Sequence, residues 1–351
     1  MSATWRPKGG QCHCPPCRHT GAHNCLQLGR NVQTILLSVP WTWNFGEPAG
    51  SIRECTFKLI GRSSEWRASR FQARLRMITD AFTLGRLAKD FKTVVLSTVG
   101  AEAGLTAALI KLRSRSTRVI VFDFLAPKAE FPHWMARAML GFIDRFLVIR
   151  SGDCAMLGRR FGVPAQRCSF LRWPVRADQI PTTTSEAGYV YAAGWAHRDW
   201  PTLVEALDQS KLPAKIAPGR EVDVPADSRH RIEVLDMPSP DQGRQLAAHA
   251  SVIAVVMVDT DLPSGPLVLL DAMAAGKAVV ATAVNGTRDY VRAEQTALVV
   301  PPGNPASLSA ALTRLASDPE LRARLGAAAR TETLDRCSLE RFWEGLADQC
   351  Q

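Results

Sequence analysis

The chain has 351 residues, which suits two domains of ordinary size, and its 46% content of hydrophobic residues is typical of a globular protein. No apolar run approaches about 18 residues, which excludes a transmembrane helix, and the polar N-terminus lacks the apolar core of a secretion signal. The net charge of +10 is unevenly placed, because residues 1–180 hold 27 Lys and Arg against 11 Asp and Glu, whereas residues 181–351 hold 16 against 22.

The basic first half predicts contact with an anionic surface or ligand. No zinc-finger, helix-turn-helix or RNA-recognition signature accompanies this charge, so we do not expect nucleic acid as a partner. An anionic membrane face or a lipid-phosphate acceptor fits the charge instead. We therefore expect a cytoplasmic protein, with peripheral contact between its basic half and the inner face of a membrane.

Residues 1–30 form a separate segment, which we interpret as a disordered extension that bears Cys and His. A zinc site is the alternative, since the ligand types suit zinc although their spacing is not that of a standard finger. The candidate ligands are Cys12, Cys14, Cys17, Cys25, His13, His19 and His23. The remaining cysteines are scattered, and we expect reduced thiols at Cys55, Cys154, Cys168, Cys337 and Cys350.

Residues 31–180 are predicted to form an N-terminal Rossmann-like domain. Short β-branched runs predict strands over residues 32–39, 55–60, 93–97, 118–122, 146–149 and 168–175. Helices are expected over residues 65–91, 100–112 and 132–143, which gives the alternating order of a doubly wound sheet. The helix over residues 65–91 interleaves apolar and Arg residues, and either covers the sheet or lies on a membrane surface. Asp123 directly follows a strand, at the edge where such sheets bind ligands.

A second Rossmann-like domain is expected over residues 181–336, after a polar linker that coincides with the change of charge. Its strands are predicted over residues 189–193, 215–218, 231–235, 251–258, 278–281 and 297–300. Helices are expected to begin near Pro201 and over residues 267–275, 305–316, 318–334 and 339–349.

Residues 251–282 give the clearest local pattern, because a buried strand, a polar loop, a helix ended by Gly276 and a second strand form a βαβ unit. The helix N-terminus presents free N–H groups that suit a phosphate. Ser264 and Gly265 let a ligand approach the backbone closely. Asp271, one to two turns into the helix, could accept hydrogen bonds from sugar hydroxyls.

This stretch resembles the nucleotide-sugar motif of GT-B-fold glycosyltransferases, particularly the retaining family 4 (glycosyl transferases group 1) enzymes. Their pattern is Glu-x7-Glu followed by Ala-Met-Ala-x-Gly-Lys-Pro-Val-Val, and Asp271-Ala-Met-Ala-Ala-Gly-Lys-Ala-Val-Val280 matches its second half. The resemblance implies that Asp271 holds the ribose of the nucleotide. The first Glu of the family, which contacts the donor sugar, falls on Pro263.

The segment Gly194-Trp-Ala-His-Arg198 is similar to a second element of that family. The resemblance places Arg198 on the lysine that neutralises the donor diphosphate, a task suited to a guanidinium. The family's earlier arginine falls near Trp195, and His197 could compensate for it. Met237 would lie beside the nucleotide base.

The resemblance implies an α/β protein of GT-B fold, with two Rossmann-like doubly wound domains facing a central cleft and a helix over residues 337–351 crossing back to the first domain. It implies a metal-independent hexosyltransferase of polysaccharide biosynthesis that uses no cofactor and transfers a sugar, with retention, from a nucleotide diphosphate sugar to a glycan or lipid-linked acceptor. Asp123 and Arg198 are the candidate catalytic residues. The candidate donor-binding residues are Gly194, Trp195, His197, Arg198, Met237, Ser264, Gly265, Pro266, Leu267 and Asp271.

Three alternatives stay open. Val258-Asp-Thr-Asp261 matches the strand-Asp-x-Asp pattern with which GT-A glycosyltransferases hold a metal, although we interpret it as a polar loop and expect no metal site. A degenerate nucleotide-binding scaffold without turnover would explain Pro263 and Trp195. A GT-B-fold nucleotide-sugar epimerase would share the fold but needs carboxylates at the reacting sugar.

Overall fold

The structure is a computed structural model that describes residues 33–39, 48, 50–61, 79, 81–97, 101–124, 133–181, 185–261 and 266–351. The Cys- and His-bearing extension, with its zinc alternative, lies outside the described residues, as does most of the helix expected over residues 65–91.

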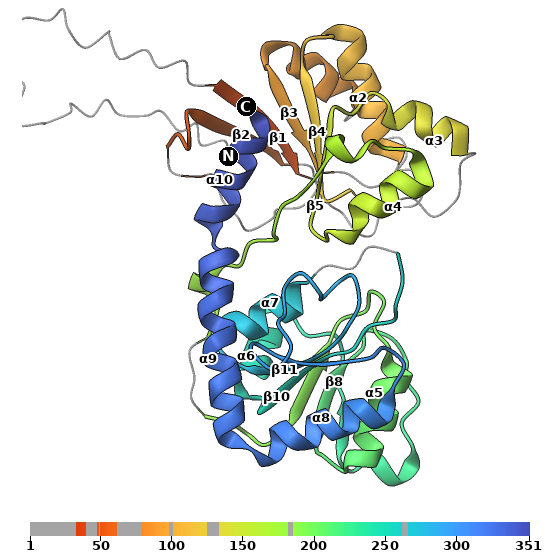
Figure 1. The fold of residues 1–351 in the computed structure, drawn as a ribbon, viewed down its shortest axis with the longest axis vertical. Coiled ribbons are helices and arrows are strands. Elements are labelled where there is room, and N and C mark those ends of the chain that lie inside the picture. The colour runs from red at the N-terminus through yellow and green to blue at the C-terminus, as the bar shows by residue number, and fades with distance from the viewer. Residues whose placement is uncertain are drawn as a thin grey trace, which may run out of the picture.

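Two six-stranded sheets, each with all neighbouring strands parallel, form the centre of the molecule (Figure 1). The first has the order β2-β1-β3-β4-β5-β6, from β1 (Gln33–Val39), β2 (Cys55–Gly61), β3 (Thr93–Leu96), β4 (Arg118–Phe122), β5 (Arg145–Val148) and β6 (Cys168–Phe170). The second has the order β12-β11-β10-β7-β8-β9, from β7 (Val190–Ala193), β8 (Ala214–Ala217), β9 (Ile232–Val234), β10 (Val252–Val255), β11 (Ala278–Thr282) and β12 (Leu298–Val300). The predicted α/β class with two doubly wound sheets is confirmed.

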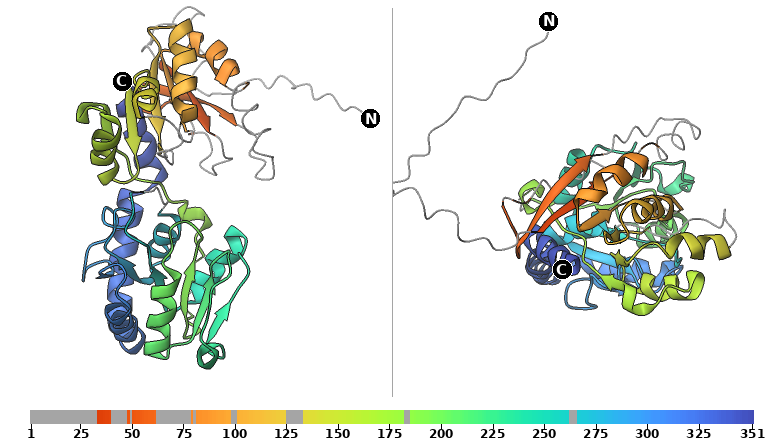
Figure 2. Two further views of the ribbon diagram at one scale, coloured as in Figure 1. Left: turned by 90° about the vertical axis from the view of Figure 1, so that its right-hand side faces the viewer. Right: turned by 90° about the horizontal axis from the view of Figure 1, so that it is seen from above.

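Helices connect the strands and cover the sheets (Figures 1 and 2). They are α2 (Ala101–Arg113), α3 (His133–Leu140), α4 (Gly152–Phe161), α5 (Trp200–Ser210), α6 (Pro240–His249), α7 (Leu267–Ala274), α8 (Pro305–Ser317), α9 (Pro319–Arg336) and α10 (Leu339–Cys350). Among the described residues, no helix is long and apolar enough to cross a membrane. We call β1–β6 with α2–α4 and α10 the first domain, and β7–β12 with α5–α9 the second domain.

Local signals account for most helix ends in the second domain. Asp199, Asn304 and Asp318 each cap a helix by accepting a backbone N–H, and each cap is followed by a proline in the first turn. Gly276 has a φ of 72° one residue beyond the C-cap of α7, which confirms its predicted C′ position.

Sequence reasoning missed α4 and α6. The first turn of α6 follows a complete capping box, in which the Ser239 side chain accepts from the Gln242 amide and the Gln242 side chain accepts from the Ser239 amide. That signal was available in the sequence. Helix α4 buries Met156, Leu157 and Phe161 and ends at Gly162 in the left-handed conformation, so its signal was also present in the sequence.

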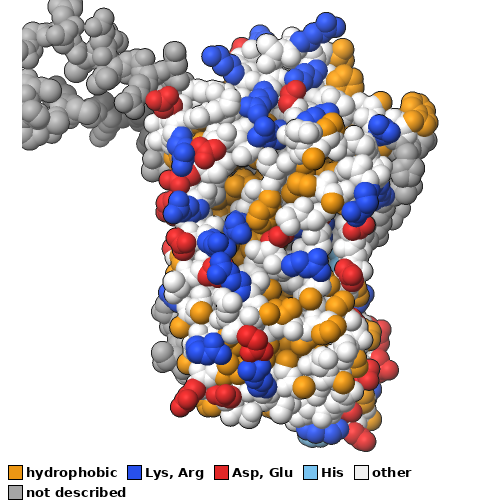
Figure 3. Space-filling view, in the orientation of Figure 1, with side chains coloured by type: hydrophobic (Ala, Val, Ile, Leu, Met, Phe, Trp, Pro, Cys, Tyr) orange, Lys and Arg blue, Asp and Glu red, His pale blue; other side chains and the backbone are white. Residues whose placement is uncertain are grey.

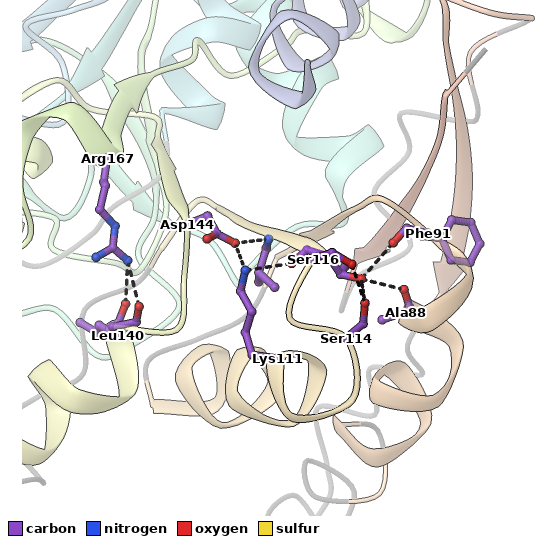
Figure 4. A network of polar contacts seen from close by, with 11 residues as sticks. Ala88, Phe91, Lys111, Ser114, Ser116, Leu140, Asp144 and Arg167 are labelled. Atoms are coloured by element: carbon purple, nitrogen blue, oxygen red, sulfur yellow. Dashed lines mark hydrogen bonds and ion pairs between the residues drawn. The ribbon is translucent and has the colours of Figure 1, made fainter. Parts of the chain in front are cut away.

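A polar network ties α2 and β4 to β5 at the end of the first domain remote from the second (Figure 4). Asp144, just before β5, accepts from the Val119 amide at 2.7 Å and pairs with Lys111 of α2 at 2.6 Å. Lys111 also donates to the Thr117 carbonyl at 2.9 Å. Asp144 is therefore held in a structural network.

Cys154 of α4 and Cys168 of β6 form a disulfide, with their Cα atoms 5.6 Å apart. The expectation of reduced thiols is wrong for this pair. Its cause is tertiary, because packing of the first turn of α4 against β6 brings together two cysteines that the sequence shows only as scattered. The three other cysteines among the described residues, Cys55, Cys337 and Cys350, are free and buried.

Helix α10 packs on the first sheet although it follows the second domain in the chain (Figure 1). The Trp343 ring lies 5.0 Å from that of Phe57, and the Phe342 ring lies 5.3 Å from that of Phe122. Thr93 at the start of β3 donates its hydroxyl to the Cys350 carbonyl at 3.4 Å. One buried apolar cluster thus runs from the first sheet through α10 into the second domain.

Replacing Trp343 by Ala should lower the free energy of unfolding by about 3–5 kcal/mol, because the ring is almost fully buried and no neighbour can fill its volume. Chemical denaturation followed by circular dichroism measures the change. Trp134→Ala is the matched control, since that indole is 72% exposed, and it should change the stability by less than about 0.5 kcal/mol. Equal effects of the two substitutions would contradict the packing described for α10.

Candidate active site

The carboxyl ends of the strands of the two sheets face each other (Figure 1). Contacts between segments that follow β5 and β11 establish this arrangement. The Ser151 hydroxyl donates to Asp289 at 2.6 Å, and the Asn285 side-chain amide donates to Asp153 at 2.9 Å. In parallel α/β sheets this edge is where ligands bind, and most of the site residues expected from the sequence lie along it.

Arg198 is a nearly buried cation without a carboxylate partner. Its side chain lies between β7 and α5, is 9% exposed, and donates through Nε to the Ala193 carbonyl at 3.0 Å. Burial lowers the pKa of the guanidinium to about 10, which still leaves it charged at neutral pH. No ion pair joins it to any residue that the structure describes. Such a group is suited to an anion that enters from outside the chain.

Gly194 creates the space that Arg198 occupies. Its φ of 114° belongs to a backbone conformation that favours glycine, and a Cβ atom there would lie 2.9 Å from Arg198 Nε. A larger residue would therefore displace the guanidinium. The backbone conformation at position 194 and the closeness of Arg198 both explain why a glycine stands there.

Asp271 is the corresponding anion: among the described residues, no group donates a hydrogen bond to its carboxylate. It lies partly buried on α7, and burial raises its pKa to about 6, against a smaller opposing effect of Arg244. Within the described part of the chain its side chain makes no hydrogen bond or ion pair. A ligand with hydroxyl groups would satisfy it, since a carboxylate accepts up to four hydrogen bonds.

The N-terminus of α7 is described from Pro266 onward. Pro266 is the N-cap and makes no side-chain cap, so the first amides of α7, beginning with Leu267, lack a capping side chain. Ser264 and Gly265, together with Pro263, lie outside the described residues.

Trp195 and Met237 lie on either side of Gly219, which follows β8. A Cβ atom on Gly219 would be 2.6 Å from Met237 Cε and 3.6 Å from Trp195 Cβ. Both flanking side chains are exposed. His197, with a φ of 53°, accepts the Val258 amide through its carbonyl at 3.0 Å and so ties this segment to the end of β10. The structure thus brings Gly194, Trp195, His197, Arg198 and Met237 together.

Asp123 lies in the first domain, just past β4, and has a φ of 52°. Burial raises the pKa of its carboxyl to about 7, whereas Arg150 lowers it and Asp153 raises it further. This group can therefore hold or release a proton near neutral pH. Asp123 is distant in sequence from the candidate donor-binding residues, and it lies with them at the facing carboxyl edges of the two sheets.

Two other features of the sequence have structural roles. Lys277, from the Gly-Lys pair of the motif, is buried and pairs with Glu186 at 3.6 Å, away from Arg198 and Asp271. The Asp261 carboxylate of the strand-Asp-x-Asp pattern is exposed and lies 3.9 Å from Arg159. Among the described residues, no group of three or more Asp, Glu, His or Cys side chains is arranged to hold a metal ion.

Sequence reasoning missed a set of residues at the junction of the domains: Arg150, Asp153, Asn285, Asp289 and Tyr290. Arg150 and Asp153 form a buried pair, and the Tyr290 hydroxyl donates to the Ile149 carbonyl at 2.6 Å. Arg150 and Asp153 are three positions apart, but the partners of these residues across the junction lie more than 100 positions away in the chain, so no local pattern could have revealed the contact.

Comparison with known proteins agrees with this geometry. Residues 238–332, which include α7 and Asp271, match the sequence model of the family "Glycosyl transferases group 1". This part of the second domain is therefore similar to the glycosyl transferases group 1 family. No curated protein sequence matches the chain.

Solved glycosyltransferase structures share the fold across nearly the whole chain. A glycosyltransferase from Rickettsia africae matches with a TM-score of 0.67 at 13% identity, covering 91% of this chain and 98% of that one. Anabaena HepE in complex with UDP matches with a TM-score of 0.65 at 12% identity (90% and 99%), and sucrose-phosphate synthase from Thermosynechococcus elongatus with 0.68 at 15% (90% and 98%). The chain has the two-domain GT-B fold of glycosyltransferases.

Replacing Asp271 by Asn should stabilise the protein in the absence of nucleotide at neutral pH. Because ionisation of the buried carboxyl is unfavourable, its pKa is raised. The contribution of Asp271 to the free energy of unfolding is fully present below about pH 4 and is lost as the pH rises through about 6. A shift of about two pKa units corresponds to roughly 1–3 kcal/mol at pH 7.5, and the gain should vanish at pH 4.

Chemical unfolding at both pH values measures this difference, with Asp223→Asn as the control at an exposed aspartate. A loss of stability in Asp271→Asn at pH 7.5 would show that the carboxylate has a partner within the folded chain.

Proposed function

We propose that the protein transfers a hexosyl group from a nucleoside diphosphate sugar to a glycan or lipid-linked acceptor, with retention of the anomeric configuration. The observation that carries the proposal is that, among the described residues, neither the Arg198 guanidinium nor the Asp271 carboxylate of the second domain forms an ion pair. A nucleoside diphosphate offers both a diphosphate anion and ribose hydroxyl donors. In this proposal, residues 31–180 form the acceptor-side domain and residues 181–336 form the nucleotide-sugar-binding domain. Residues 337–351 form the helix that crosses back to the first domain.

In the proposed reaction the bond between the anomeric carbon and the diphosphate oxygen breaks, and the diphosphate leaves with the electron pair. Arg198 and the N-terminal amides of α7 stabilise the charge that develops on the leaving oxygen. The acceptor hydroxyl attacks from the same face and passes its proton to the departing diphosphate oxygen, and a new glycosidic bond forms. Asp271 holds the ribose, and the positive end of the helix with Arg198 takes the place of a metal ion.

Asp123 is the proposed catalytic group of the first domain. Its ionised carboxylate would stabilise positive charge on the sugar ring as the bond breaks. Because burial raises its pKa to about 7, a change of about one pH unit alters the fraction in that form.

The acceptor side of the proposal rests on charge. Lys and Arg side chains are spread over the first domain on the face shown in Figure 3, whereas Asp and Glu gather at its left edge and around the second domain. This distribution favours an anionic or lipid-linked acceptor and a cytoplasmic protein that meets the inner face of a membrane. For the donor, HepE has been solved with UDP-glucose, which makes uridine diphosphate sugars the first to test.

A nucleotide-binding scaffold without turnover is the second candidate. It is favoured by Pro263 and Trp195, which replace an acidic and a basic residue of the family pattern. It shares the nucleotide site with the main proposal and differs from it only in turnover.

Nucleotide binding should depend on Arg198. In a thermal-shift panel of UDP, GDP, ADP and TDP, the wild type should be stabilised by one of them by about 2.7 kcal/mol at 100 times its Kd, which is a rise of a few degrees. Arg198→Gln should weaken that affinity about 10- to 100-fold, since a hydrogen bond to a charged group contributes about 1.5–3 kcal/mol.

The control is Arg314→Gln, which removes an exposed arginine paired with Glu294 and should leave affinity unchanged. With the matching nucleotide sugar and a lipid-linked or glycan acceptor, proton NMR of the anomeric position of the product should show the donor's configuration. Stabilisation by a nucleotide without any transfer or hydrolysis would favour the scaffold. A folded wild type that responds to none of the four nucleotides would reject both candidates.

Asp123→Asn should separate catalysis from binding. The variant should keep the affinity for the nucleoside diphosphate, because the residue lies in the other domain, but lose about 100-fold or more in kcat. The wild-type rate should rise with pH through about 7 as the carboxyl ionises, and this dependence should be absent in the variant. Steady-state kinetics between pH 5.5 and 8.5 checks both points, and an unchanged kcat would remove Asp123 from the mechanism.

A further inference from the structure

The segment that joins β5 to α4 is held by the second domain at consecutive positions. The Ile149 carbonyl accepts from the Tyr290 hydroxyl, and the Ser151 amide and hydroxyl both donate to Asp289, at 2.7 and 2.6 Å. The Asn285 side chain packs so closely on Gly152 that a methyl group there would clash with it.

A buried ion pair lies in the middle of this contact. Arg150 is 1% exposed and Asp153 is 3% exposed. The guanidinium binds the carboxylate with two bonds, from Nε to Oδ2 at 2.9 Å and from Nη2 to Oδ1 at 2.6 Å. A forked pair of this kind fixes the orientation of both groups.

Both members of the pair also reach into the second domain. Arg150 Nη2 donates to the Asp261 carbonyl at 3.4 Å, and Asp153 Oδ1 accepts from Asn285 Nδ2 at 2.9 Å. Asp261 follows the last residue of β10 by six positions and precedes Pro266, the N-cap of α7, by five. The first domain thus contacts the backbone that leads to the proposed diphosphate site.

We propose that Arg150 is a positioning residue for sugar transfer, which fixes the Asp261 backbone of the donor domain from the acceptor-side domain. This inference rests on the proposed function. Asp153 and Asn285 hold the guanidinium in place, and the three residues form an interdomain clasp. The clasp is complete only when the two edges meet, because one half of each contact across the junction comes from each domain.

The chemistry of the clasp supports a role in geometry. A buried ion pair contributes little net stability compared with apolar side chains of the same volume, because both charges must be desolvated. What it provides is fixed orientation. A misplacement of about 1 Å in groups that align a reaction can cost on the order of 100-fold in rate. The clasp would therefore act by fixing the position of the Asp261 backbone. Arg150 also lowers the pKa of Asp123, which places the guanidinium near the proposed catalytic carboxyl.

The test compares Arg150→Gln, Arg150→Lys and Asn285→Ala in the full chain. Arg150→Gln should lower kcat/KM for the nucleotide sugar about 100-fold, and Arg150→Lys should lower it less, because an ammonium keeps the charge but cannot form the fork. Asn285→Ala leaves the buried pair intact and should lower kcat/KM about tenfold. Arg314→Gln, which removes a forked exposed pair remote from the junction, is the control.

The pH dependence separates positioning from simple loss of stability. Without the guanidinium the pKa of Asp123 rises, since burial and Asp153 both act in that direction, so the rise of kcat with pH should move to higher pH in Arg150→Gln. Arg314→Gln should leave it in place. If Arg150→Gln does not fold, Asn285→Ala carries the test.

Wild-type values of kcat/KM in folded Arg150→Gln or Asn285→Ala would overturn the clasp. A loss of kcat/KM that only follows the loss of folding stability, with the pH dependence of kcat unchanged, would also overturn it. A wild type that binds no nucleoside diphosphate would instead reject the proposed function, so the two failures are distinguishable.

Discussion

The position of the two sheets relative to each other depends on the apolar contact that crosses the junction. Tyr290 leaves the second domain and packs its ring beside Phe170 while its hydroxyl donates to the Ile149 carbonyl, and it accepts from the Trp173 amide. Its burial removes it from water, and the two backbone partners satisfy its hydroxyl completely. Because of this contact and the return of α10 to the first sheet, the carboxyl edges face each other and residues from distant segments can share one site.

The site itself is built at the expense of local stability. Arg198 and Asp271 are both withdrawn from water and form no ion pair with a residue that the structure describes, which is unfavourable for a folded chain in isolation. By contrast, the buried Lys277 and the partly buried Arg322 of the second domain both pair with Glu186. In the proposed function a bound nucleotide supplies the partners of Arg198 and Asp271.

The sequence was most informative where the physical signal is local. The twelve strands among the described residues coincide with predicted strands, because buried parallel strands are short apolar runs bounded by turns. Strands β6 and β10 are shorter than predicted, since the residues that follow them are apolar for other reasons: Trp173 and Val175 enter the core of the junction, and Met257 lies under the segment around Arg198. Gly194 and Arg198 were chosen from the family resemblance, and Asp271 from that resemblance and from its place in the helix after the polar loop.

The junction could not be predicted in the same way. Arg150 reads in sequence as an ordinary charged residue after a strand, and Asn285 and Asp289 as polar residues of a turn. Their meaning arises only when two domains close on each other and exclude water from Arg150 and Asp153. The disulfide between Cys154 and Cys168 is non-local for the same reason. Since the proposed site lies between two domains, the residues that hold the domains together are the ones that local sequence patterns leave unmarked, and the candidate donor-binding residues alone give an incomplete description of that site.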